Sequence, residues 1–139
     1  MRAVIHHNPA CGTSRNVLAI LHASDVELTV IEYLETGWTR PQLLGLFAAA
    51  GLTPRDALRT SKSPAKKLGL LDETVSDEVL LNHMLEHPIL VNRPLVCTAK
   101  GVKLCRPSET VFALLQTRPK GPLYKEDGAM LLDAEGNLV

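Results

Sequence analysis

Two apolar stretches, residues 2–6 and 27–34, are separated by one helix-length segment, and this spacing strongly limits how the chain can fold. Branched residues are frequent in both stretches, as is typical of strands. The segment between them follows a helix-capping residue, Thr13 or Ser14, and has apolar residues at helical spacing, at Val17, Leu18, Ile20 and Leu21. Two strands joined by such a crossover helix pair in parallel.

The middle of the chain, at about residues 38–88, is predicted to be a helical insertion. Each predicted helix begins with a Ser or Thr cap beside a proline or an acidic residue. These starts are Thr39–Pro41, Thr53–Pro54, Ser63–Pro64 and Ser76–Glu78. The first helix ends at Gly51, the next two are short, and the last ends before Pro88.

After this insertion the pattern changes to short apolar runs on either side of a turn at Ala99–Gly101, which predicts a β-hairpin. A last helix is expected from Pro107. The tail from Arg118 is rich in proline and glycine, so we expect irregular structure with a short helix near Met130. Taken in order, the elements predict an α/β fold: a thioredoxin-like mixed sheet of order β-α-β-α, helical insertion, β-β-α, in one domain over residues 1–139.

Composition excludes several classes of function. The 15 Lys and Arg residues balance the 15 Asp and Glu residues, and only 4% of the chain is aromatic, which argues against binding to nucleic acid or a membrane surface. No apolar run approaches the ~20 residues that span a bilayer, and no export signal is recognisable. Three cysteines, an odd number, then suggest reduced thiols in the cytoplasm.

Cys11 is the candidate reactive thiol because it lies in a Pro/Gly loop between the first strand and the first helix. There the sulfur faces unpaired backbone N–H groups and the positive end of the helix dipole, which favour the thiolate. Dithiol exchange would require a second cysteine where Ser14 stands, and a phosphatase-type loop would require arginine where Val17 stands. A cysteine protease would need a partner histidine, for which the five histidines give no characteristic spacing.

Other metal-ligating and sulfur residues are predicted to be structural. His83 and His87 match a zinc-binding spacing, but a third ligand of characteristic spacing is lacking and the helix ends at once, so no metal is expected. Cys97 and Cys105 flank the hairpin turn and are expected to be reduced. No nucleotide-binding glycine motif occurs, so no bound cofactor is expected.

Residues 7–16, with the sequence HNPACGTSRN, resemble the active-site loop of the glutaredoxin-coupled arsenate reductases. The loop alone is shared with redox regulators and glutathione-using proteins, whereas the loop together with three arginines is far more specific. The resemblance covers almost the whole chain and includes Tyr33–Glu35, Ala57–Arg59, Leu68–Leu70, His87–Pro94, Leu104–Glu109 and Lys125–Gly128.

The resemblance implies that Cys11 is the nucleophile, that Ser14 donates to its thiolate and that His7 tunes its pKa. Three arginines would bind the oxyanion through charge-assisted hydrogen bonds: Arg59, Arg93 and Arg106. The implied substrate is arsenate, with glutathione as co-substrate and glutaredoxin as partner. The fold further implies a cis peptide bond before Pro94.

Two alternatives remain open at this stage. One is a thioredoxin-like redox regulator of transcription, and the other is a glutathione-dependent oxidoreductase that acts on thiols. Neither needs three guanidinium groups around the thiol, so the arginines favour the arsenate reductase.

Overall fold

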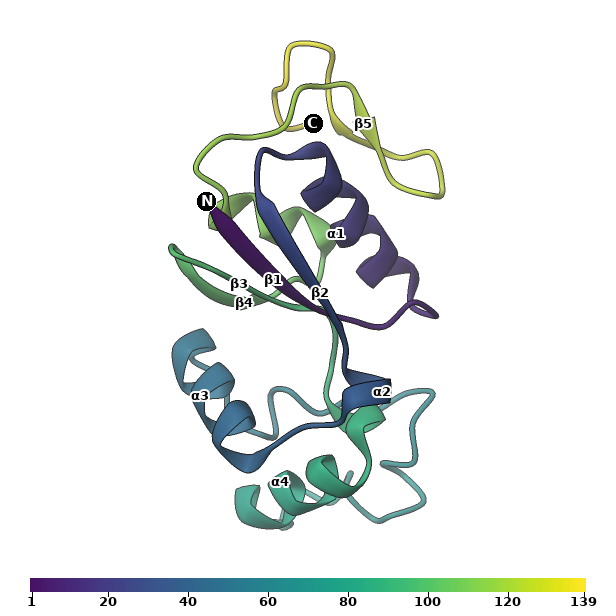
Figure 1. Cartoon of the computed structure of the whole chain (residues 1–139). Coiled ribbons are helices and arrows are strands. Elements are labelled where there is room, and N and C mark those ends of the chain that lie inside the picture. The colour runs from purple at the N-terminus through teal and green to yellow at the C-terminus, as the bar shows by residue number, and fades with distance from the viewer. The chain divides into compact units, whose positions relative to one another are not determined.

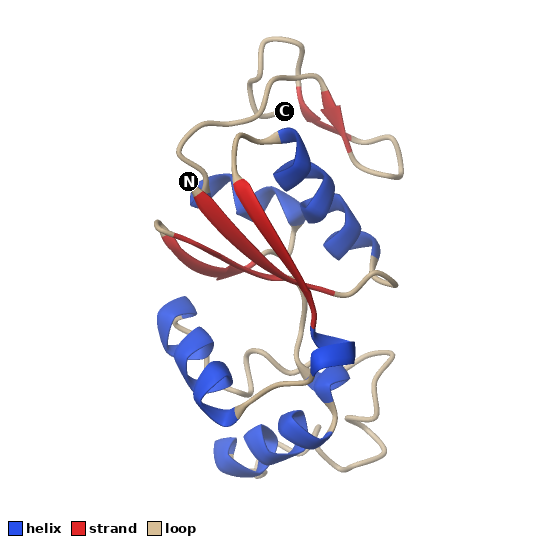
Figure 2. Cartoon of the chain, viewed as in Figure 1, coloured by secondary structure: helices blue, strands red, loops and turns tan.

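The computed structural model describes residues 1–139, which form two compact units. The sheet unit comprises Met1–Glu32 and Arg93–Val139, and the helical unit comprises Tyr33–Asn92. The helical unit is slightly wider than the predicted insertion at 38–88. All strands lie in the sheet unit (Figures 1 and 2). No helix has the length and apolar character needed to cross a membrane.

The sheet unit is built on four strands: β1 (Arg2–His7), β2 (Glu27–Glu32), β3 (Leu95–Thr98) and β4 (Gly101–Leu104). Their order in the sheet is β2-β1-β3-β4. β1 pairs with β2 in parallel and with β3 in antiparallel fashion, and β3 and β4 form the predicted hairpin. The mixed thioredoxin-like sheet predicted from the element order is therefore confirmed.

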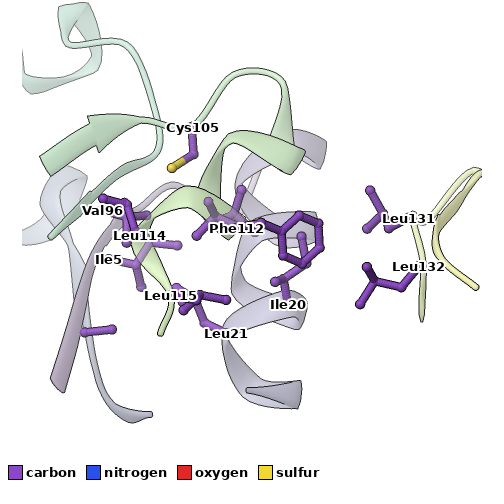
Figure 3. Close-up of a cluster of buried hydrophobic side chains, with 13 residues drawn as sticks. Ile5, Ile20, Leu21, Val96, Cys105, Phe112, Leu114, Leu115, Leu131 and Leu132 are labelled. Carbon is purple, nitrogen blue, oxygen red and sulfur yellow. The ribbon is translucent and has the colours of Figure 1, made fainter. Parts of the chain in front are cut away.

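Helix α1 (Gly12–Ala23) and the 3-10 helix η2 (Ser108–Leu114) cover one face of this sheet (Figure 1). Alternation along β1 places Ala3 and Ile5 on that face, where both are fully buried. Figure 3 shows the resulting aliphatic core, which also contains Val17, Ile20, Leu21, Val96, Cys105, Val111, Phe112, Leu114, Leu115, Leu131 and Leu132.

The ends of two helices in the sheet unit differ from the sequence prediction. α1 begins at Gly12 with Cys11 as its N-cap, so the helix starts earlier than a cap at Thr13 or Ser14 would place it. The backbone at Cys11 is extended, which an N-cap requires. The segment after Pro107 forms a 3-10 helix in place of an α-helix.

The C-terminal tail was predicted to be irregular with a helix near Met130, and this was wrong. Met130 begins strand β6 (Met130–Leu132), which pairs antiparallel with β5 (Leu123–Tyr124). The strand forms because Leu131 and Leu132 are buried in the core against α1 and η2. Tertiary packing therefore overrides a weak local signal.

The helical unit contains α2 (Tyr33–Thr36), α3 (Arg40–Ala50), α4 (Asp77–Glu86) and the 3-10 helix η1 (Pro88–Leu90). Thr39 and Gln42 form a reciprocal capping box at α3, and Gly51 ends that helix with a φ of 69°. Ser76 caps α4 by accepting from the Val79 N–H. These caps confirm the two longer helices predicted from sequence.

The short helices predicted at Thr53–Pro54 and Ser63–Pro64 are absent, and turns occupy both places. The Arg55 side chain explains part of this difference. Its guanidinium donates to the carbonyl oxygens of Leu70, Asp72 and Val75, which holds this stretch in turns.

Ile20 should be important for stability, because it is completely buried on α1. We predict that Ile20→Ala lowers the free energy of unfolding of the sheet unit by about 2–5 kcal/mol. Leu44→Ala is the matched control, since Leu44 is 50% exposed on a helix. Chemical denaturation followed by circular dichroism measures both. Equal losses in the two variants would contradict the assigned core.

Candidate functional site

Cys11 lies at the junction of β1 and α1, where the chain makes a tight turn. The Asn8 side chain accepts from the Ala10 N–H at 2.9 Å, and the Cys11 N–H donates to the Asn8 carbonyl at 3.1 Å. This turn directs the chain from the end of the strand into the helix. The Cys11 side chain is only 7% exposed and sits at the positive end of the α1 dipole.

The strand register brings two arginines to the same end of the sheet as Cys11. His6, near the end of β1, pairs with Leu95 at the start of β3, and Leu95 pairs with Leu104 at the end of β4. Arg93 precedes this β3 position and Arg106 follows the β4 position. The order of the strands therefore brings the segments that carry the thiol and both guanidinium groups together at one end of the sheet.

Arg106 contacts the thiol directly. Its Nη1 lies 3.7 Å from the Cys11 Sγ and donates to the Arg93 carbonyl at 3.2 Å. The Arg93–Pro94 peptide bond is cis, as predicted, and the Arg106–Pro107 bond is also cis. Both arginines thus directly precede a proline at a corner of the chain.

The environment of Cys11 lowers the pKa of its thiol. Burial alone would raise this pKa, but the Ser14 backbone N–H, the charge of Arg93 and side-chain hydrogen bonds from Arg93 and Arg106 together lower it. The Ser14 N–H lowers the pKa of the thiol, although its geometry with the sulfur falls short of a capping hydrogen bond. The site is therefore arranged to hold a thiolate.

His7 and Ser14 form a buried pair beside this thiol. His7 Nδ1 hydrogen-bonds with the Ser14 hydroxyl at 2.6 Å, and the same hydroxyl accepts from the Asn8 N–H at 3.1 Å. Burial lowers the pKa of His7, as does Arg15, while Glu32 raises it. Neighbouring His6 is also buried, and its pKa is lowered to about 4.

These contacts refine what the sequence implied for the pair. The resemblance implies that Ser14 donates to the thiolate and that His7 tunes the pKa of the thiol. The Ser14 hydroxyl contacts His7 and Asn8, while its backbone N–H stabilises the thiolate. The lowered pKa of His7 disfavours its charged form, and its ring serves as a hydrogen-bond partner of Ser14. Asn8 was not singled out from the sequence, although an Asn-Pro pair after a strand is a turn signal.

Arg59 belongs to the helical unit. It is 8% exposed, its Nε donates to the Ser61 carbonyl at 3.0 Å, and its backbone N–H bonds to the Leu90 carbonyl. Arg59 is therefore the one predicted site residue in the helical unit. The other five lie in the sheet unit: Cys11, His7, Ser14, Arg93 and Arg106.

The other two cysteines are thiols of ordinary structural kind. Cys97 pairs with Val102 in the hairpin, so it does not face Cys105 across the strands. Burial raises the pKa of Cys97 and raises that of Cys105 to about 12. Neither is disulfide-bonded. Cys11 is therefore the one cysteine whose surroundings favour the thiolate.

The motif at the end of α4 brings three metal-ligating side chains together. Ligand atoms of His83, Glu86 and His87 lie within 4.8 Å of one another. These atoms are closer together than we expected from the spacing of the residues in the sequence. Glu86 is exposed, and the two histidines are half-buried. None of the contacts made by Cys11 involves this group, which belongs to the helical unit.

Fold and site together define a thioredoxin-like protein with one activated cysteine at a helix N-terminus, flanked by arginines. The chain matches the ArsC family over residues 6–114. It therefore belongs to the ArsC family.

Curated relatives extend this match over nearly the whole chain. Arsenate reductase ArsI2 of Synechocystis sp. is 63% identical over 136 residues, which are 98% of this chain and 97% of that protein. The arsenate reductase of Escherichia coli K12 is 48% identical over 132 residues, covering 95% of this chain and 94% of its own.

Solved structures confirm the fold. The arsenate reductase from Vibrio cholerae superposes with a TM-score of 0.77 at 38% identity and covers 83% of this chain and 98% of its own. A putative arsenate reductase from Yersinia pestis gives 0.73 at 33% identity, covering 79% and 97%. These two proteins are almost fully matched but leave about a fifth of this chain without a counterpart.

The lowered pKa of Cys11 predicts that its thiol is alkylated at a lower pH than the thiol of a free cysteine. Since the folded site favours the thiolate, the rate of reaction with iodoacetamide should rise with pH to a midpoint below the ~8.5 of a free cysteine. Mass spectrometry of the labelled peptide measures this midpoint. Cys11→Ser should react slowly over the same range, because burial raises the pKa of both remaining thiols. A midpoint at or above the free value would refute activation.

Proposed function

We propose that this protein is an arsenate reductase that uses glutathione and glutaredoxin. The observation that carries the proposal is the contact of the Arg106 guanidinium with the sulfur of an activated Cys11, in a chain of the ArsC family. Relatives that align with 95–98% of this chain are named arsenate reductases.

The first step is attack of the Cys11 thiolate on As(V). An S–As bond forms and one arsenate oxygen leaves as water. Arsenate carries negative charge at neutral pH, so a thiolate that approaches it meets repulsion unless cations lie beside the path. Guanidinium groups offset this repulsion and bind the oxygens through paired hydrogen bonds. We assign this role to Arg93 and Arg106, and to Arg59 as the third guanidinium.

Two further thiols complete the reduction. The thiol of glutathione replaces a second oxygen on arsenic, which leaves as water. A glutaredoxin thiolate then attacks the glutathione sulfur, and the electron pair of the broken S–As bond stays on arsenic. Arsenic is thereby reduced from As(V) to As(III), and glutaredoxin retains glutathione as a mixed disulfide. Water hydrolyses the remaining bond and releases arsenite and Cys11.

The external thiols are required because the chain offers no internal partner for Cys11. Ser14 stands where a dithiol loop would have its second cysteine. Cys97 and Cys105 have raised pKa values, so they are poor attacking groups. No bound cofactor is needed in this scheme. Because it depends on reduced glutathione, we place the protein in the cytoplasm.

A glutathione-dependent oxidoreductase acting on thiols and a redox regulator are the alternatives. Both would use an activated thiol, but neither would need to bind a tetrahedral oxyanion. The Arg106 contact favours the reductase, because a guanidinium beside the sulfur serves both the thiolate and an arriving anion.

The mechanism predicts that one cysteine suffices. Cys11→Ser should abolish arsenite production from arsenate, whereas the Cys97→Ser/Cys105→Ser double variant should keep most of it. Turnover of that double variant should require glutathione and glutaredoxin together, measured by NADPH consumption with glutathione reductase. Efficient turnover with thioredoxin and its reductase alone would overturn the proposed reductant.

The arginines predict a second set of effects. Arg93→Ala and Arg106→Ala should each raise the KM for arsenate and also raise the alkylation pKa of Cys11, because each removes positive charge from the thiolate. Arg59→Ala should raise the KM as well, because it removes the third guanidinium. Arg2→Ala is the matched control, since this side chain is 89% exposed. An unchanged KM in all three site variants would refute the oxyanion role.

A further inference from the structure

The C-terminal hairpin, which we define as residues 118–139 with strands β5 and β6, lies beyond the end of the family match at residue 114. It is nonetheless attached firmly to the sheet unit. Leu131 and Leu132 are buried in the core, and Figure 3 shows their side chains directed toward Phe112 and Ile20. The hairpin therefore has a fixed position relative to α1 and η2.

One arm of the hairpin contacts the thiol loop through Glu126. Its carboxylate accepts two hydrogen bonds from Arg15, from Nε to Oε1 at 2.6 Å and from Nη2 to Oε2 at 3.1 Å. Its backbone N–H donates to the Asn16 side chain at 2.9 Å. Arg15 Nη1 in turn donates to the Pro9 carbonyl at 2.8 Å, so the Arg15 side chain links the residues on both sides of Cys11.

The ion pair also lies directly against the residue that follows the nucleophile. A side-chain carbon at Gly12 would lie 3.7 Å from Arg15 Nη2 and 3.8 Å from Glu126 Oε2. The guanidinium and carboxylate therefore form the wall of the loop on that side.

Lys125, the neighbour of Glu126 in the hairpin, forms an ion pair with the segment that follows Arg106. Lys125 Nζ lies 2.8 Å from Glu109 Oε1, and the Ser108 hydroxyl donates to the same carboxylate at 3.1 Å. Glu109 follows Arg106 by three residues along the chain. Two consecutive residues of the hairpin thus hold the two segments that carry Cys11 and Arg106.

We propose that Lys125 and Glu126 form a bracket that positions the Cys11 sulfur against the Arg106 guanidinium. Each ion pair is partly exposed, with side chains 24–49% accessible, so each contributes little to overall stability. The pairs instead fix the relative position of two segments that are about a hundred residues apart in the sequence. Both are positioning residues, since neither touches the sulfur.

The test uses Glu126→Gln and Lys125→Met in the full chain, with Glu135→Gln as the matched control. Glu135 is an exposed acid on the same hairpin. Each bracket variant should leave the thermal midpoint close to that of the parent and raise the alkylation pKa of Cys11. Each should also lower kcat for arsenate by roughly tenfold to a hundredfold, as expected for a small misplacement of reacting groups. The control should match the parent in every measurement.

A cycle with Arg15→Gln separates positioning from simple loss of charge. If Glu126 acts through Arg15, the Arg15→Gln/Glu126→Gln double variant should be no worse than the poorer single variant. Glu126→Asp, which keeps the charge, should recover part of the loss. Additive effects in the cycle, or an alkylation profile unchanged in both bracket variants, would overturn the bracket.

The kinetic arm rests on the proposed function, but the alkylation arm does not. If the parent protein fails to reduce arsenate while Glu126→Gln still raises the pKa of Cys11, the proposed function fails and the bracket stands. If the parent reduces arsenate and the bracket variants behave like Glu135→Gln, the bracket fails alone.

Discussion

A sulfur that is nearly closed off from water is held as a thiolate only where hydrogen-bond donors and positive charge lie beside it. In this protein the Ser14 N–H and Arg93 supply part of that environment, and the guanidinium of Arg106 lies 3.7 Å from the sulfur of Cys11. The two residues are 95 positions apart in sequence, so the contact depends on the whole sheet unit. The β2-β1-β3-β4 order places the last residues of β1 and of β4 at the same end of the sheet. Cys105, which is buried without these hydrogen-bond donors, has its pKa raised to about 12.

Hydrogen bonds between neighbouring residues hold the loop that carries the thiol. The Asn8 turn and the His7–Ser14 pair fix the loop from within, because the side chains of Asn8, His7 and Ser14 all form hydrogen bonds inside it. The arginine segments and the hairpin fix it from outside. A site built in this way needs little rearrangement when an anion arrives, because its charges already occupy their positions.

The sequence was sufficient to predict the parts of the molecule that depend on local chemistry. Strand spacing predicted the mixed sheet, Thr39 and Ser76 marked helix starts correctly, and the loop around Cys11 was identified. What failed was decided by distant contacts: the tail strand at Met130 forms because its neighbours are buried in the core. The role of Glu126 was also invisible, since a glutamate in a turn carries no signal of an arginine 111 residues away.

X-ray absorption at the arsenic edge tests the central claim most directly, because it reports the atoms bonded to arsenic. The Cys97→Ser/Cys105→Ser variant incubated with arsenate should show one sulfur neighbour supplied by Cys11, and a second after glutathione is added in the absence of glutaredoxin. Additional Cys11→Ser should remove the protein sulfur. A spectrum with oxygen neighbours alone in the Cys11-containing protein, with and without glutathione, would contradict attack of the thiolate on arsenic.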